Sequence, residues 1–136
     1  MYELLYPYSA TVLAMGVTAG LMLIQMLVAD VAGIRAGHVP GAPVAADHGS
    51  FLFRATRAHA NTNESVTAFA LLALFGIFTA ATASWLNGLA WCYVAGRVGH
   101  MLCYYLDQRL ARSTFFTVSL LALVGMLVIG IAAWLR

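Results

Sequence analysis

Four long apolar runs, separated by polar segments, account for most of the 136-residue chain. The runs cover roughly residues 10–34, 65–83, 85–106 and 114–135. Each is about as long as the roughly 20 residues with which an α-helix crosses a hydrocarbon core about 30 Å thick. Because an open strand cannot satisfy its backbone polar groups in lipid, the pattern predicts an all-α, integral membrane four-helix bundle.

The polar segments between the runs differ in length. The first extends from Arg35 to about Arg54, and it contains the residues expected to end the first helix: Gly37, Pro40, Gly41 and Pro43. The connection near Ser84 is very short, so the second and third helices must be antiparallel neighbours. The four runs therefore predict one domain over residues 1–136.

Composition supports a membrane protein. Hydrophobic residues make up 62% of the chain and charged residues 9%, whereas a soluble domain carries roughly 25% charged residues. This composition excludes a soluble enzyme and a disordered regulator. The net charge of +2 comes from seven arginines without a basic run, so nucleic acid is excluded as a partner and membrane lipids are expected.

The arginines are distributed unevenly around the four runs. Arg136 alone lies on the side of the chain termini, and five arginines follow the first or third run: Arg35, Arg54, Arg57, Arg109 and Arg112. By the positive-inside rule, the first and third connections are cytoplasmic and both termini are outside. We therefore expect this orientation in an inner or plasma membrane.

Two polar stripes occur where lipid does not tolerate isolated charges. In the third run, Arg97, His100 and Tyr104 have the spacing i, i+3, i+7 and share one helical face. A charged group at that depth costs about 3 kcal/mol on insertion scales, so this face must point toward protein or water. The segment that enters the second run carries the other stripe: Arg54, Arg57, Asn61 and Glu64. Both stripes point inward from the same side of the membrane.

The charges of these stripes allow two interpretations. In the first, Glu64 and Arg97 form an interhelical ion pair that braces the bundle. In the second, four arginines against one glutamate leave uncompensated positive charge, which indicates an anionic ligand. A metal is not expected, because the four histidines have no pairing at ligand spacing.

The same residues resemble the signature of a known family. Residues 53–64 contain the spacing RxxxNxxE, and residues 97–104 contain RxxHxxxY. Together these motifs resemble those of the MAPEG family, the membrane-associated proteins in eicosanoid and glutathione metabolism. The chain length, the four runs and the long first connection are also similar, and the resemblance is to a bacterial-type member like the microsomal glutathione transferases.

The resemblance implies a homotrimer that binds glutathione, as a co-substrate, between neighbouring subunits near the cytoplasmic face. A hydrophobic small molecule or lipid would be the second ligand. Arg112, near the start of the fourth helix, resembles the arginine that stabilises the glutathione thiolate in active members. Together with the stripes, the resemblance gives the expected glutathione-binding residues: Arg35, Arg54, Arg57, Asn61, Glu64, Arg97, His100, Tyr104 and Ser113.

Ala60, Thr62 and Ser65 differ from the residues of eicosanoid-forming members, so the resemblance does not extend to eicosanoid chemistry. The leading hypothesis is a glutathione transferase or peroxidase of small hydrophobic electrophiles, with Arg112 as the catalytic residue. The alternative is a non-catalytic lipid-binding or scaffold subunit, since a fold does not fix an activity. A small transporter is least favoured, because the polar residues gather at one side and the fourth run has none in its middle.

Overall fold

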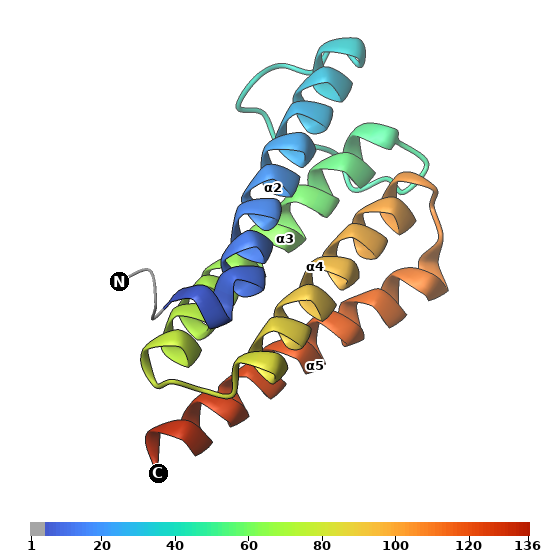
Figure 1. The fold of residues 1–136 in the computed structure, drawn as a ribbon. Helices are drawn as coiled ribbons and strands as arrows, with labels where there is room; N and C mark the ends of the chain where they lie inside the picture. The colour runs from blue at the N-terminus through green and yellow to red at the C-terminus, as the bar shows by residue number, and fades with distance from the viewer. Residues whose placement is uncertain (1–4) are drawn as a thin grey trace.

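Four helices and one short 3-10 turn account for most of residues 5–136, the part of the chain that the computed structural model describes (Figure 1). The turn η1 (Tyr6–Tyr8) leads into α2 (Ser9–Arg35), which is followed by α3 (Phe51–Phe78), α4 (Ala83–Tyr105) and α5 (Arg109–Trp134). No strand occurs among these residues. The prediction of an all-α fold with four long helices is therefore confirmed.

The helix α3 begins at Phe51, and not at residue 65 as the apolar pattern predicted. Ser50 caps it, because its hydroxyl oxygen accepts a hydrogen bond from the backbone N–H of Phe53 at 3.4 Å. The polar stripe thus lies on a regular helix, whose buried face in this segment consists of small residues: Ala55, Ala58 and Thr62. The apolar run begins later than the helix because polar residues precede it, and an amphipathic helix accommodates such residues on its exposed side.

The other helix boundaries differ less from the prediction. The helix α3 ends at Phe78, before residue 83, and residues 79–82 form the short turn to α4. This turn makes α3 and α4 antiparallel neighbours, as expected (Figure 1). The helix α5 begins at Arg109 and not at residue 114, so Arg112 lies in its first turn.

The connection between α2 and α3 covers residues 36–50 and is shorter than predicted. Gly37 and Gly41 have φ angles of 63° and 83°, in the left-handed region that glycine adopts without steric strain. The predicted helix breakers therefore lie just beyond the end of α2, where they let the chain turn toward α3.

The helix α4 is the most buried of the four and packs most extensively against α5. Two glycines allow this close approach. A Cβ atom at Gly96 would collide with Ser119, and one at Gly99 would collide with the ring of Phe115. Because small residues let membrane helices pack closely, the two glycines determine how near α5 lies to the polar face of α4.

The beginning of α2 is attached to α4 through Asn87. Its Oδ1 accepts hydrogen bonds from the backbone N–H of Thr11 at 3.0 Å and from the Thr11 hydroxyl at 2.7 Å. Its Nδ2 donates to the carbonyl oxygen of Pro7 at 2.9 Å. The first N–H groups of a helix have no intrahelical acceptor, so Asn87 caps α2 from a neighbouring helix.

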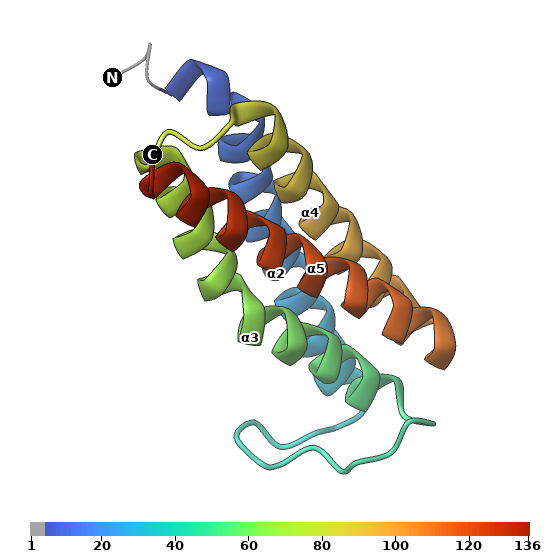
Figure 2. The same cartoon turned by 90° about the horizontal axis from the view of Figure 1, so that it is seen from below.

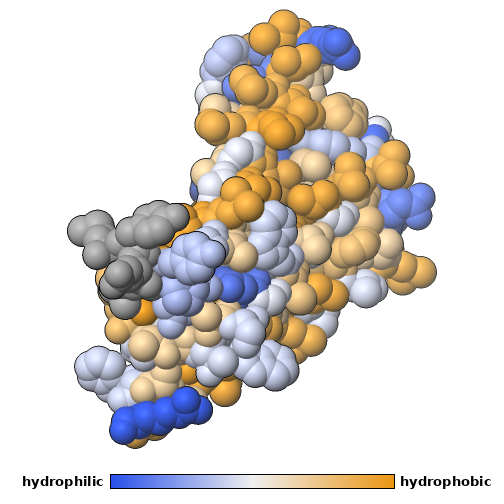
Figure 3. All heavy atoms as spheres, viewed as in Figure 1, coloured by the Kyte–Doolittle hydropathy of each residue, from blue (hydrophilic) through white to orange (hydrophobic). Residues whose placement is uncertain are grey.

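Apolar side chains cover much of the outside of the bundle, including the upper part of α2 in the view of Figure 3. Two segments, Tyr6–Arg35 and Arg109–Trp134, are long and apolar enough to cross a membrane. The polar stripes lower the hydropathy of α3 and α4. In α4 the stripe is turned inward, with Arg97 and His100 almost completely buried, as the cost of a charge in lipid predicted.

The arrangement of the helices permits a direct test of the predicted topology. The turn η1 and the end of α5 lie at one end of the bundle, and the α2–α3 connection lies at the other (Figure 2). In a variant without Cys92 and Cys103, a single cysteine at Ser9 is expected to react with an impermeant thiol reagent added outside. A cysteine at Ala45 should react only after permeabilisation. Equal external labelling at both positions would contradict the positive-inside orientation.

Candidate functional site

Arg97 of α4 is 1% exposed and joins three helices. Its Nε donates a hydrogen bond to the hydroxyl oxygen of Ser119 on α5 at 3.0 Å, and its Nη1 donates to Oδ1 of Asn61 on α3 at 2.8 Å. The guanidinium carbon lies 5.8 Å from the ring centroid of Tyr93 and 5.6 Å from that of Phe116. Arg97, Asn61 and Ser119 are here called the Arg97 network.

Of the two interpretations of the stripes, this network contradicts the ion pair between Glu64 and Arg97. Glu64 is exposed on α3, and within residues 5–136 Arg97 has no carboxylate partner. A buried charge requires hydrogen-bond acceptors, and here the neutral side chains of Asn61 and Ser119 supply them. Two of the guanidinium nitrogens of Arg97 are thus occupied by protein contacts that hold α3, α4 and α5 together.

Arg112, Tyr104 and His100 form a second group, here called the Arg112 cluster. The guanidinium carbon of Arg112 lies 4.5 Å from the ring centroid of Tyr104. The Tyr104 ring meets the His100 ring edge-on, with 5.1 Å between the centroids. Both rings are buried, whereas Arg112 is half-buried. Nδ1 of His100 is buried and has no hydrogen-bond partner among the residues that the structure describes.

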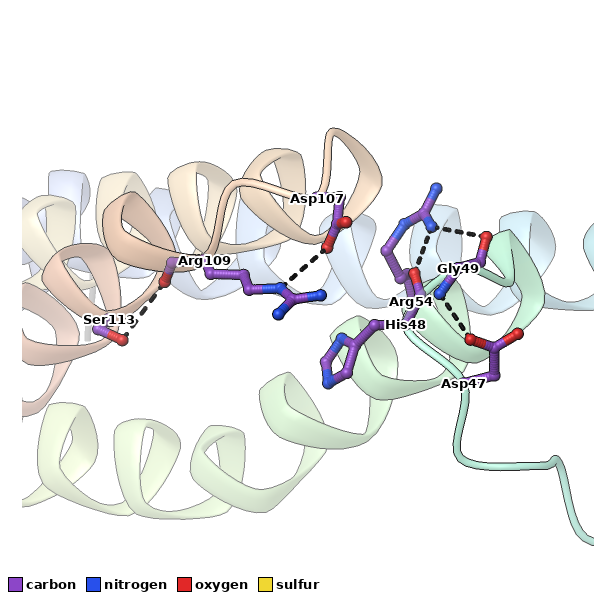
Figure 4. Close-up of polar contacts among 7 residues, drawn as sticks. All are labelled: Asp47, His48, Gly49, Arg54, Asp107, Arg109 and Ser113. Atoms are coloured by element: carbon purple, nitrogen blue, oxygen red, sulfur yellow. Dashed lines mark hydrogen bonds and ion pairs between the residues drawn. The ribbon is translucent and has the colours of Figure 1, made fainter.

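Among the residues that the structure describes, no carboxylate neutralises the positive charge of Arg112. Across the described chain, the one ion pair joins Arg109 and Asp107 at 3.9 Å (Figure 4). An arginine side chain stays protonated at every working pH. A half-buried cation that lies against an aromatic ring and has no acidic partner can stabilise a bound anion such as a carboxylate or a thiolate.

Arg54 is directed at the α2–α3 connection. Its Nη1 donates hydrogen bonds to the carbonyl oxygens of His48 at 2.6 Å and Gly49 at 3.1 Å (Figure 4). Its guanidinium carbon also lies 5.7 Å from the ring centroid of Phe51. These contacts hold the end of the connection against the first turn of α3, and a contact of Arg54 with glutathione stays a prediction.

The other predicted site residues have exposed side chains: Arg35, Arg57, Glu64 and Ser113. Arg57 and Glu64 lie two turns apart on α3, on the stripe that also carries Asn61. The hydroxyl of Ser113 donates to the carbonyl oxygen of Arg109 within α5 at 3.5 Å. A single chain thus assembles the Arg97 network and the Arg112 cluster, and it leaves these four residues at its surface.

Three contacts of the site were not anticipated: Tyr93, Phe116 and Ser119. Ser119 lies near the start of the fourth run, where it is 2% exposed and accepts a hydrogen bond from Arg97. Tyr93 lies one turn before Arg97, so helical spacing alone places it on the same face. No comparable signal exists for Ser119 and Phe116, because the pairing of α4 with α5 is not visible in a single sequence.

Comparison with known proteins gives one result for the whole chain. The family model described as the MAPEG family matches residues 3–132. No curated protein matches the chain. The matched range includes all of the predicted site residues.

Proposed function

Because this chain belongs to the MAPEG family, a membrane-associated family, we propose that it is a glutathione-dependent transferase or peroxidase of small hydrophobic electrophiles. The Arg112 cluster is the observation that supports this activity best. It provides a cation that has no acidic partner within residues 5–136 and is half-buried at the end of the bundle where the arginines gather. The resemblance assigns the thiolate of glutathione to this position.

The charges of α3 suit the rest of the tripeptide. Glutathione carries two carboxylates and one ammonium group. A guanidinium such as that of Arg57 binds a carboxylate with two parallel hydrogen bonds, and Glu64 is the matching partner for the ammonium group. Oδ1 of Asn61 accepts a hydrogen bond from Arg97, so Nδ2 of Asn61 remains as a donor for the ligand. Arg35, Arg54, His100, Tyr104 and Ser113 complete the proposed set.

A homotrimer is part of the proposal. Arg57 and Glu64 are exposed in a single subunit, where water screens their charges. A neighbouring subunit that covers them would lower the local dielectric constant and strengthen their interactions with a charged ligand. We therefore place glutathione between subunits.

The reaction begins with loss of the thiol proton to water. An unperturbed thiol has a pKa of about 8.5, and a neighbouring guanidinium lowers such a pKa by about 1–3 units. In the transferase reaction, the thiolate sulfur forms a bond to an electrophilic carbon while the leaving group departs with its electron pair. In the peroxidase reaction, sulfur takes the terminal oxygen of a hydroperoxide, an alcohol is released, and a second glutathione gives the disulfide and water. An apolar electrophile reaches the site through the bilayer.

Binding of glutathione is expected to depend on Arg57 and Glu64. Arg57→Ala and Glu64→Gln should each weaken binding by about 2–5 kcal/mol, because each leaves a desolvated charge of the ligand unpaired. Arg136→Ala removes an exposed charge at the opposite end and should bind like the wild type. Native mass spectrometry of the detergent-solubilised protein, with and without glutathione, measures both the occupancy and the number of subunits.

A different outcome would favour the non-catalytic subunit. If Arg57 and Glu64 only brace the bundle, the variants will unfold at lower temperature while the folded fraction binds glutathione as the wild type does. If the monomer binds glutathione with full occupancy, the glutathione site does not lie between subunits.

A further inference from the structure

Two polar contacts, one helical turn apart, connect the polar stripe of α3 to α4. The first is the hydrogen bond from Arg97 to Asn61 in the Arg97 network. The second joins the phenol oxygen of Tyr93 to the hydroxyl oxygen of Ser65, which lie 2.8 Å apart. On each helix the two contacting residues are four positions apart. The two contacts are therefore successive rungs between antiparallel helices.

Tyr93 is the donor in the second rung. Ser65 has one hydroxyl proton, and it donates this proton to the carbonyl oxygen of Thr62 at 3.2 Å. The Ser65 oxygen must therefore accept the proton of Tyr93. Because Tyr93 is 0% exposed, water cannot replace Ser65 as the acceptor. A buried hydroxyl is costly to leave without a partner, so the folded chain keeps this bond.

The ring of Tyr93 is fixed by two further contacts. It stacks on the ring of Phe69 from α3, with 4.2 Å between the centroids and 9° between the planes. The guanidinium carbon of Arg97 lies 5.8 Å from the Tyr93 ring centroid. Phe69 and Arg97 are themselves buried. The phenol oxygen thus has a defined position, and Ser65 is held against it.

The second rung lies next to Glu64, which directly precedes Ser65 on α3. Ser65 is half-buried, whereas Glu64 is exposed. Adjacent residues of a helix differ by about 100° in direction, so a contact that fixes Ser65 also fixes the direction in which the Glu64 side chain leaves the helix. Tyr93 does not reach the surface, and it can act on a ligand at Glu64 only through α3.

We propose that Tyr93 is a positioning residue of the glutathione site, because its bond to Ser65 fixes the turn of α3 that presents Glu64 to the ammonium group of the tripeptide. This role rests on the proposed function. Arg57 lies beyond the first rung, on the other side of Asn61, and the second rung does not hold it. Tyr93 thus acts on the ammonium end of the ligand and not on the carboxylate at Arg57.

The test compares Tyr93→Phe with Tyr8→Phe in the full chain. Each change removes one buried hydroxyl and keeps the ring. The Tyr8 hydroxyl donates to the carbonyl oxygen of Ala81 at 2.7 Å, at the end of the bundle away from the arginines. Both variants should unfold at a lower temperature in detergent. Only Tyr93→Phe should also raise the dissociation constant of glutathione, by about 2- to 13-fold, which corresponds to the net contribution of one hydrogen bond.

A glutathione analogue without the α-amino group tests whether the effect passes through Glu64. The analogue has no ammonium group for Glu64 to bind, so Tyr93→Phe and the wild type should bind it equally well. Ser65→Ala removes the acceptor of the same bond. This variant and its combination with Tyr93→Phe should each weaken glutathione binding as much as Tyr93→Phe alone, because all three lack the same rung.

The outcomes separate this role from the proposed function. Equal glutathione affinities in Tyr93→Phe and Tyr8→Phe would overturn the role of Tyr93 and leave the proposed function standing. Equal losses of affinity for glutathione and for the analogue in Tyr93→Phe would do the same. A wild type that does not bind glutathione would instead overturn the proposed function, and the role of Tyr93 with it.

Discussion

Gly96→Ala is expected to destabilise the bundle by about 1–5 kcal/mol, although alanine is the better helix former. Alanine gains about 1 kcal/mol over glycine within a helix. At Gly96, however, the new Cβ atom would collide with Ser119 and lie 3.0 Å from the carbonyl oxygen of Phe115. Overpacking of this kind costs about 1–3 kcal/mol, and a displaced Ser119 leaves a donor of Arg97 without its acceptor at a similar cost.

Gly88→Ala is the matched control for this prediction. Gly88 lies on the same helix, and nothing lies within 4 Å of a Cβ atom placed there. Only the gain in helix propensity remains, so this variant should be slightly more stable than the wild type. Thermal or denaturant unfolding in detergent measures both changes. If the two variants are equally stable, α4 and α5 do not approach as closely as the structure describes.

The helices could be predicted from the sequence because each has an apolar face long enough to be recognised. The exception, the first half of α3, shows where this reasoning fails. Residues 51–64 are helical because Ser50 caps them and small residues such as Ala55 and Ala58 pack inward, while Arg57 and Glu64 are exposed. A pattern based on apolar runs finds the part of a helix that lipid or protein surrounds. It does not find the part that carries a polar site.

The candidate site was predictable within one helix and not between helices. Spacing along α4 correctly placed Arg97, His100 and Tyr104 on one buried face. Charge offered Glu64 as one possible partner of Arg97, whereas the structure gives it Asn61 and Ser119. Charge alone does not select a partner, because a neutral amide and a hydroxyl also satisfy a buried guanidinium.

Arg112→Ala is expected to reduce the thiolate fraction and the rate while glutathione binding changes little. In the proposed site, Arg112 faces the sulfur, and the tripeptide is held by Arg57, Asn61 and Glu64. Removal of Arg112 should raise the pKa of the bound thiol by about 1–3 units, toward the value of about 8.5 in water. The thiolate fraction at neutral pH then falls, and the affinity for the tripeptide changes little.

The expected loss of rate is smaller than the loss of thiolate. Each unit of pKa above neutral pH lowers the thiolate fraction about tenfold, but a thiolate of higher pKa is also a better nucleophile, with a Brønsted slope of about 0.4–0.5. For a shift that ends at a pKa of about 8.5, the two effects together reduce the second-order rate with a small aryl halide at pH 7 by at most about fourfold. An interaction that acts on the transition state and not on binding has this kinetic pattern.

Arg109→Ala distinguishes this role from that of an ordinary arginine at a cytoplasmic helix end. Arg109 lies in the same turn of α5, but it is exposed and paired with Asp107, whereas Arg112 is half-buried against Tyr104. The absorbance of the thiolate of bound glutathione at about 240 nm is measured against pH. The midpoint of this titration should shift in Arg112→Ala and stay unchanged in Arg109→Ala. If the two variants give the same titration curve, or if the wild type has no thiolate at neutral pH, Arg112 does not stabilise the thiolate. The alternative, a non-catalytic member of the family, would then be favoured.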